Sequence, residues 1–213
     1  LDAAVVGAMA SKFRNTGQTC VCANRILVQE GVYEAFAAKM AEAAKAMKVG
    51  PRTEPGVVQG PLINADAVAK VEEHIEDAVK GGAKILAGGR RHALGGNFFE
   101  PTVLAEVPAG AKIFSEETFG PVASLIRFVD VDEAVSIAND TEYGLAASIW
   151  SRDQGYALRL ARRIKAGNIW INAHGLQDAA IPFGGFRQSG IGRENGLDGV
   201  LLYTENKSTV MRL

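Results

Sequence analysis

The sequence has almost no excess of charge of either sign. Its 23 Lys and Arg residues stand against 24 Asp and Glu residues, which leaves a formal net charge of −1 at pH 7. A groove for nucleic acid, or a face that binds an anionic membrane, would need a strongly basic surface. No apolar run approaches the roughly 20 residues that cross a bilayer. No signal peptide is visible either, because Leu1-Asp2 leads directly into an amphipathic segment. These absences favour a cytoplasmic protein that binds neither nucleic acid nor a membrane.

Cysteine is scarce as well. Cys20 and Cys22 are the only two cysteines and lie one residue apart, which excludes a disulfide framework and favours a reducing compartment. They also lack the second pair of ligands that a zinc site needs, so we expect no metal. A strand–GxGxxG–helix unit for binding a dinucleotide is missing too.

Hydrophobic spacing predicts alternating helices and strands. Val5, Met9 and Phe13 recur every fourth residue and predict a helix over residues 2–15, while Asn64 and Asp132 are the predicted N-caps of later helices. The other predicted helices cover 32–50, 68–79, 135–138, 157–164 and 193–202, and the predicted strands cover 25–29, 84–87, 99–107, 122–128, 145–150, 168–172 and 207–213. Short connections imply an α/β layered fold with helices on both faces of a largely parallel sheet. The last strand has no evident partner within the chain, so we expect it to pair with another chain.

The segment FRNTGQTCVCANR, from Phe13 to Arg25, is the stretch around which the rest is organised. Cys20 lies there in a Gly/Thr-containing turn between a helix and a strand, where a thiolate can be presented as a nucleophile. Backbone N–H groups from Thr19 to Val21 can stabilise both a thiolate and an oxyanion. The alternative is a buried structural cysteine, which is the commoner state of a free thiol.

Four other residues are candidates for binding or catalysis, each with a plain structural alternative. Arg14 can hold a substrate anion near the thiol or be a surface cation. Glu117, in the pair before Phe-Gly-Pro, can accept hydrogen bonds from a ribose or belong to a solvated turn. Phe183 fits a pocket or the core equally well. His174 lies in a long loop and can approach Cys20 to form a thiol hydrolase, or remain a solvated histidine.

Seven segments in this order resemble the aldehyde dehydrogenase superfamily. They are FRNTGQTC at 13–20, GPLIN at 60–64, EETFGPV at 116–122, YGLAASIWS at 143–151, GNIWIN at 167–172, PFGGFRQSGIGRENG at 182–196 and YTENK at 203–207. The resemblance covers essentially the whole chain. It implies a three-layer αβα catalytic domain over residues 1–200 and an oligomerisation tail over residues 201–213, hence a homo-oligomer. It also implies oxidation of a small aldehyde with NAD or NADP as cofactor.

Members of that superfamily carry a dinucleotide-binding domain, a general-base glutamate and an oxyanion-hole asparagine upstream of the cysteine motif. None of these is present in this sequence, which starts with Leu rather than Met. We therefore interpret it as the catalytic portion of a longer polypeptide and expect that it does not turn over alone. A non-catalytic assembly fragment is the alternative reading.

The resemblance also implies roles for individual residues. Cys20 matches the catalytic thiol, which attacks the aldehyde to give a thiohemiacetal and then a thioester. Glu117 matches the glutamate that binds the nicotinamide-side ribose, and Phe119 packs beside it. Phe183 matches an aromatic residue that lines the aldehyde tunnel.

Within the superfamily, Arg14 together with the Cys-Val-Cys pattern at 20–22 is similar to succinate-semialdehyde dehydrogenases. In those enzymes the arginine binds the distal carboxylate of the substrate. Cys22 matches a second cysteine that forms a redox-switch disulfide with the nucleophile in some members. Where those enzymes have a carboxylate-contacting Ser before Pro-Phe-Gly-Gly, this sequence has Gln177. Another aromatic or aliphatic aldehyde is therefore the alternative substrate.

Overall fold

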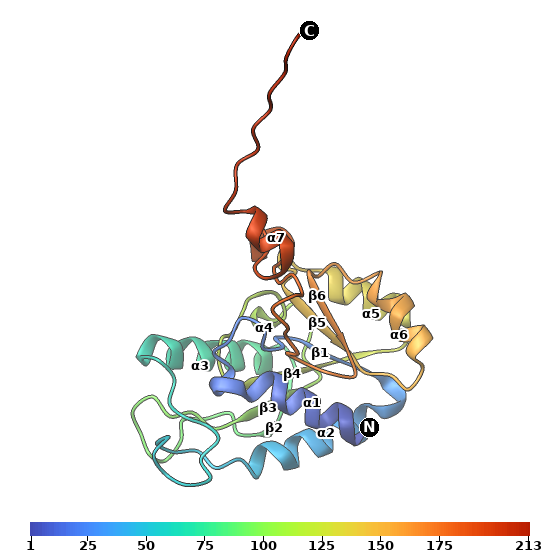
Figure 1. The fold of residues 1–213 in the computed structure, drawn as a ribbon. Helices are drawn as coiled ribbons and strands as arrows, with labels where there is room; N and C mark the ends of the chain where they lie inside the picture. Colours follow the sequence, from blue (N-terminus) through green and yellow to red (C-terminus); the bar gives the residue numbers. More distant parts are fainter.

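The computed structural model describes residues 1–213 and consists of two sheets surrounded by helices (Figure 1). The strands are β1 (Ile26–Gln29), β2 (Lys84–Ala87), β3 (Thr102–Ala105), β4 (Val122–Phe128), β5 (Ala146–Ile149) and β6 (Asn168–Ile171). The helices are α1 (Asp2–Phe13), α2 (Glu30–Lys45), α3 (Ala65–Lys80), α4 (Lys112–Ser115), α5 (Val131–Asn139), α6 (Gln154–Ala161) and α7 (Gly196–Leu201), with short 3-10 segments at Arg14–Gly17 and Arg187–Ser189. None of the helices has the length and apolar character needed to span a membrane.

Most strand pairings are parallel, as predicted. The larger sheet has the order β1-β4-β3-β2, in which β4 runs parallel to both β1 and β3, and β2 runs antiparallel to β3. Strands β5 and β6 pair in parallel in a separate two-stranded sheet. The strands therefore divide between two sheets, and β1 and β5 each have one unpaired edge.

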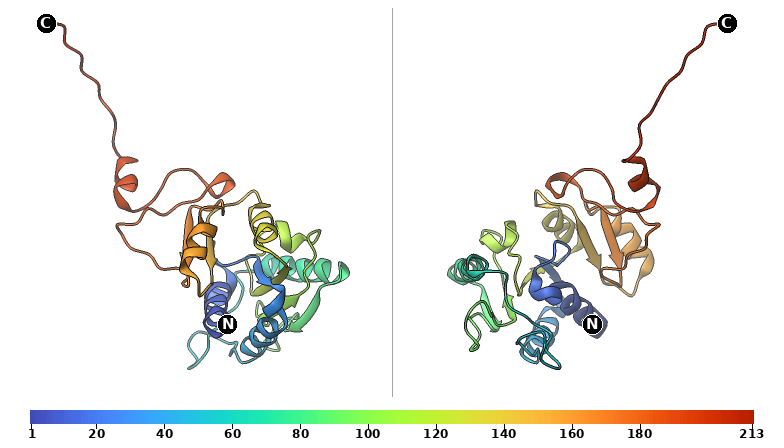
Figure 2. Two further views of the ribbon diagram at one scale, coloured as in Figure 1. Left: turned by 90° about the vertical axis from the view of Figure 1, so that its right-hand side faces the viewer. Right: turned by 60° about the vertical axis from the view of Figure 1, so that its left-hand side comes forward.

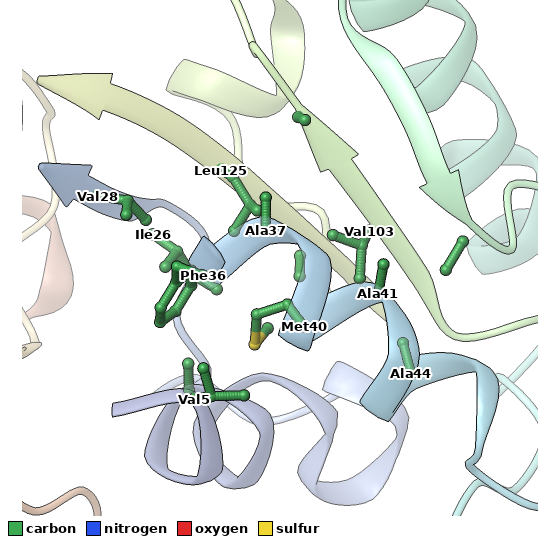
Figure 3. Packing of buried hydrophobic residues seen from close by; sticks show 14 of the residues in the cluster. Val5, Ile26, Val28, Phe36, Ala37, Met40, Ala41, Ala44, Val103 and Leu125 are labelled. Carbon is green, nitrogen blue, oxygen red and sulfur yellow. The ribbon is translucent and has the colours of Figure 1, made fainter. Parts of the chain in front are cut away.

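The larger sheet is the middle of three layers. Residues alternate along β4, so that Leu125 packs with α1 and α2 on one face while Val122 and Ile126 pack with α3 and α4 on the other. This period of two is what a strand covered by helices on both faces requires. Figure 3 shows Phe36 and Met40 of α2 lying between α1 and the sheet. The predicted αβα architecture is confirmed.

Two helix caps were predicted from sequence, and one is correct. Asn64 caps α3, because its side chain accepts a hydrogen bond from the Ala67 N–H at 2.8 Å. The predicted cap Asp132 is wrong. Asp130 caps α5 by accepting a hydrogen bond from the Glu133 N–H at 2.9 Å, and Asp132 lies in the first turn of the helix. Both aspartates have a side chain suited to capping. Only Asp130 lies three residues before an N–H group that lacks a partner within the helix, so only its carboxylate can accept that hydrogen bond.

Several helices are shorter than their sequence patterns suggested. Helix α1 ends at Phe13 rather than at Asn15, and α7 covers Gly196–Leu201 rather than 193–202. Helix α6 has the predicted length but begins and ends three residues earlier, at Gln154 and Ala161. Helix α2 stops at Lys45, and the chain beyond it bonds to the following loop, with Val58 N–H donating to the Lys48 carbonyl at 3.0 Å. Hydrophobic spacing within the helix does not record such a partner.

The chain beyond α7 runs away from the rest of the molecule (Figures 1 and 2). Residues 207–213 form no strand within this chain, because they meet no second strand with which to pair. Tyr203, Val210, Met211 and Leu213 are among the most exposed apolar side chains of the protein. Such an exposed, apolar and unpaired segment is suited to pair as a strand with another chain.

We expect these side chains to drive self-association. Replacing Val210, Met211 and Leu213 together by serine removes the apolar surface, so the mass measured by light scattering should fall towards that of the monomer. Replacing Asn206 and Ser208 by alanine alters the same segment without removing apolar surface and is the control. A monomeric unmodified chain would contradict the expectation.

Candidate active site

The thiol turn, residues 14–22, departs from α1 through an unusual backbone. Asn15, Thr16 and Gly17 all have left-handed φ angles, of 49°, 58° and 76°. A side chain disfavours this region, and Thr, with its branched Cβ, disfavours it most strongly here. The chain then makes a turn closed by the Cys22 N–H, which donates to the Thr19 carbonyl at 2.9 Å. Cys20 lies at the crest of this turn with its thiol exposed.

The loop that carries the GPLIN motif holds the strained residues in place. The Thr16 hydroxyl accepts a hydrogen bond from the Gly60 N–H at 3.1 Å and donates to the Gly60 carbonyl at 3.3 Å. The fully buried Gln59 side chain donates to the carbonyl of Phe13, the last residue of α1, at 2.7 Å. These contacts link residues more than forty positions apart and compensate for the strain of the turn.

The thiol turn also packs against a second loop, the Glu117 loop, which comprises residues 116–121. A Cβ atom at Gly17 would overlap the carbonyl oxygen of Gly120, so only glycine allows this approach. The Asn24 side chain joins the two loops, donating to the Glu116 carbonyl at 2.9 Å and accepting from the Thr118 N–H at 3.0 Å. The fold thus fixes the thiol and the predicted ribose-binding carboxylate beside each other.

Both loops open into one groove of about 1430 Å³. Its walls come from α1, β1 and β5, and Figure 2 shows the β5–β6 sheet standing beside α1. The ring of Trp150 packs directly on Gly7 of α1, where a Cβ atom would overlap it. The groove brings together four of the residues singled out in the sequence, namely Cys20, Cys22, Glu117 and His174.

Four other predicted site residues lie outside the lining of the groove. Arg14 is exposed and pairs with no carboxylate of the chain, and its Nη1 lies 3.9 Å from the position of a Cβ on Gly175. Phe119 is 40% exposed and has a left-handed φ of 51°. Gln177 is exposed in the loop after β6, and Phe183 is half-buried.

The backbone around Cys20 supplies unpaired donors. The N–H groups of Cys20 and Val21 donate to no other protein group, whereas their neighbour Cys22 closes the turn. Free N–H groups in a turn are suited to stabilising a developing negative charge on oxygen. The predicted oxyanion donors are therefore available.

Lys12 is a buried cation that sequence reasoning missed. It is 1% exposed, and burial lowers the pKa of its ammonium to about 8, a shift opposed by the negative charges of Cys22 and Glu117. In turn, burial raises the pKa of the Cys22 thiol, and the Lys12 charge offsets part of that increase. The available signal was its spacing, because Lys12 follows Val5 and Ala8 by seven and four residues and so falls on the buried stripe of α1.

His174 and Cys20 share the groove without a hydrogen bond between them. The Nδ1 atom of His174 lies 2.8 Å from the hydroxyl of Ser148, and its ring packs on Trp170 with centroids 4.9 Å apart. Burial and the charge of Arg14 lower the pKa of His174 and keep the imidazole neutral. The hydrogen-bonded Cys/His pair of a thiol hydrolase is not formed. Both cysteines are free thiols, and Cys22 Sγ lies 3.6 Å from the Arg14 carbonyl oxygen.

Comparison with known proteins identifies the family. The family model described as "Aldehyde dehydrogenase family" matches residues 1–209. This chain belongs to the aldehyde dehydrogenase family. Among curated relatives of this aldehyde dehydrogenase chain, the 3-sulfolactaldehyde dehydrogenase of Pseudomonas putida is 56% identical over 207 residues. The NADP(+) succinate-semialdehyde dehydrogenase of Escherichia coli strain K12 is 51% identical over 207 residues. In both cases the match covers 97% of this chain and 43% of the relative.

A solved structure extends the likeness from sequence to fold. The succinate-semialdehyde dehydrogenase of Burkholderia pseudomallei superposes with a TM-score of 0.91 at 54% identity, over 93% of this chain and 41% of that one. The aldehyde dehydrogenase chain thus spans less than half the length of these relatives. The family and the catalytic-domain fold predicted from the motifs are confirmed, and the roles of individual site residues stay predictions.

The buried Lys12 makes stability depend on pH. At about pH 7 the lysine is protonated in both the folded and the unfolded chain, so the cost of burying its charge is fully present. Above about pH 8 the folded chain releases this proton, while the unfolded chain keeps it up to about 10.5. The unfolding free energy should therefore rise with pH relative to Lys12→Met, by about 2 kcal/mol between pH 7 and pH 9.5.

Urea unfolding near pH 7 and near pH 9.5 measures this difference. The exposed Lys84, replaced by methionine, is the matched control and should leave the pH dependence unchanged. A constant gap between the unmodified chain and Lys12→Met at both pH values would show that Lys12 keeps an ordinary pKa.

Proposed function

We propose that this chain is the thiol-bearing catalytic portion of an NAD(P)-dependent aldehyde dehydrogenase that oxidises a small aldehyde with an anionic tail to the acid. The observation that carries the proposal is the groove. It holds an exposed thiol on a strained turn, unpaired backbone donors next to that thiol, and the Glu117 carboxylate. A nucleophile, an oxyanion site and a ribose acceptor in one place are what thiol-based aldehyde oxidation requires.

The chemistry begins at Cys20. Its thiolate attacks the aldehyde carbon, and the carbonyl oxygen takes up the negative charge, facing the free N–H groups of Cys20 and Val21. Loss of hydride from the same carbon converts this thiohemiacetal to a thioester. Water then attacks the thioester, releasing the acid and returning the thiol. The oxyanion forms twice, so the same donors serve both the acylation and the hydrolysis.

The Glu117 loop fits a nicotinamide cofactor. Glu117 and Phe119 point outwards on either side of the buried Thr118, which places an acceptor for ribose hydroxyls and an exposed aromatic surface next to the thiol turn. Glu117 and Phe119 would hold NAD or NADP there, and the bound cofactor would supply the acceptor for the hydride. The carboxylate and the ring orient the cofactor, since a ribose donates its hydroxyls and a flat nicotinamide packs on an aromatic side chain.

Arg14 is the residue proposed to bind the anionic group of the substrate. It is exposed, lacks a carboxylate partner and lies on the same turn as Cys20. The similar proteins are named for succinate semialdehyde and 3-sulfolactaldehyde, both of which carry an anionic group at the far end from the aldehyde. We propose succinate semialdehyde as the substrate, with Gln177 and Phe183 contacting it from the loop after β6.

Cys22 is the proposed partner of Cys20 in a redox switch. Hydrogen peroxide would oxidise the Cys20 thiolate to a sulfenic acid, with loss of hydroxide. The Cys22 thiolate would then displace the second hydroxide and form the disulfide, which a thiol reductant reverses. Lys12 supports this step by favouring the thiolate form of Cys22.

The test of the catalytic thiol is acylation of the chain. With succinate semialdehyde and saturating NAD⁺ or NADP⁺, we expect at most one equivalent of reduced nicotinamide and a thioester on Cys20, found by intact-mass and peptide analysis. Cys20→Ser should abolish both signals, and Cys22→Ser, the matched control, should keep them. A Cys20 that iodoacetamide alkylates normally but that never acylates would contradict the proposal. Sustained turnover would show that the group that activates water lies within these 213 residues.

The test of Arg14 uses protection of Cys20 from alkylation, which needs no cofactor. Succinate semialdehyde should slow the reaction of Cys20 with iodoacetamide, and Arg14→Met should raise the concentration needed about tenfold, as loss of a charge-assisted hydrogen bond implies. Protection by the neutral aldehyde butanal should not change. Arg52→Met, at an exposed site on a distant loop, is the matched control. Equal loss of protection with both aldehydes would assign Arg14 to the turn rather than to the anion.

A further inference from the structure

The Glu117 loop alternates between outward and inward residues. Glu116, Glu117 and Phe119 are exposed, whereas Thr118 and Gly120 are buried. Thr118 therefore anchors the loop between the two residues proposed to meet the cofactor. Any group that fixes Thr118 also fixes the direction of its two neighbours.

Two side chains from distant elements hold Thr118. Asn24, two residues after the thiol turn, accepts a hydrogen bond from the Thr118 N–H at 3.0 Å. His74, on α3, lies with its Nδ1 atom 3.1 Å from the Thr118 hydroxyl oxygen. The other ring nitrogen of His74, Nε2, lies 3.4 Å from the carboxylate of Glu116. His74 thus contacts the loop at both an inward and an outward residue, as Asn24 does, and His74 is the one of the two that bonds to the Thr118 hydroxyl.

The contacts of His74 define its protonation state. The side chain is 1% exposed, and burial, followed by the positive charge of Lys70, lowers its pKa, while the carboxylates of Glu116 and Glu73 oppose the shift. A neutral imidazole has one donor and one acceptor. With the proton on Nε2, the ring donates towards Glu116 and accepts the Thr118 hydroxyl hydrogen at Nδ1. Both polar atoms of the buried ring are then satisfied.

The backbone of the loop needs such an anchor. Phe119 is held at a φ of 51°, which costs free energy for a residue with a side chain. Next to it, Gly120 lies so close to α3 that a Cβ atom would overlap the side chain of Val71. The loop is pressed against the helix that carries His74, and the strained residue follows directly after the one that His74 holds.

We propose that His74 is a positioning residue that, through the Thr118 hydroxyl, holds the Glu117 loop in the conformation that receives the nicotinamide cofactor. The identity of the ligand rests on the proposed function. The hydrogen bond between His74 and Thr118, and its effect on the order of the loop, do not depend on that function. His74 touches neither the thiol nor the groove, so it acts only through its neighbours.

A double-mutant cycle tests whether His74 acts through Thr118. His74→Leu removes the acceptor, and Thr118→Val removes the donor while keeping the shape of the side chain. Each should speed amide hydrogen exchange in the peptide 115–121 about fivefold, the equivalent of one lost hydrogen bond. The double variant should add nothing further, because the two changes break the same bond. His74→Asn, whose amide oxygen takes the place of Nδ1, should restore slow exchange.

Exposed Thr53, replaced by valine, is the matched control and should leave exchange in this peptide unchanged. Additive effects of His74→Leu and Thr118→Val, no effect of either, or no recovery in His74→Asn would each overturn the proposal. Since Thr118→Val is isosteric, it decides the matter even where His74→Leu folds poorly.

Titration with NADH, monitored by nicotinamide fluorescence, distinguishes the positioning of the loop by His74 from the binding of the cofactor by the loop. If the loop receives the cofactor, the dissociation constant should rise about fivefold in both single variants and no further in the double variant, with no change in Thr53→Val. Altered exchange with unaltered NADH affinity would remove the cofactor role from the proposed function and leave the positioning of the loop by His74 standing.

Discussion

The close approach of Gly17 to Gly120 is the constraint on which the site depends. At this point the thiol turn and the Glu117 loop touch backbone to backbone, with no room for a Cβ atom. Asn15 and Thr16, directly before Gly17, have a left-handed backbone, and that strain must be offset elsewhere. The hydrogen bonds of Thr16 to Gly60 and of Gln59 to Phe13 supply the offset. The GPLIN motif, far from the cysteine in sequence, is thus part of the cysteine's support.

The electrostatics of the site follow from the same packing. Helix α1, which leads into the thiol turn, packs against α2 and the sheet, and its buried stripe includes Lys12, one residue before Phe13. A buried ammonium destabilises the fold. Its charge also acts on Cys22, whose pKa it lowers against the effect of burial. Burial of Lys12 therefore lowers the stability of the fold and places a positive charge beside the groove. Functional sites commonly contain charged groups whose pKa values are shifted in this way.

Sequence patterns predicted the parts of this structure that depend on local spacing. The αβα layers, the Asn64 cap and the Cys20 turn follow from hydrophobic periods, cap chemistry and turn residues. Contacts that hydrophobic spacing does not record decided the rest. Asp130 rather than Asp132 caps α5 because of where one N–H points, and the chain just after α2 bonds to Val58 in the loop that follows. The burial of Lys12 and the clamp on Thr118 likewise depend on neighbours brought together only by the fold.

Placing Arg14 and Cys20 on one rigid turn has a consequence for substrate choice. Under the proposed function, the turn sets the separation between the anion-binding group and the nucleophile, so it measures the distance between the two ends of the aldehyde. A guanidinium binds carboxylate and sulfonate alike, because both present paired oxygens with negative charge. Choice between such substrates then falls to neutral donors on the loop after β6, where Gln177 lies exposed. On this proposal, the strained turn recognises the charge and length of the substrate, and the loop after β6 recognises the shape of its anionic group.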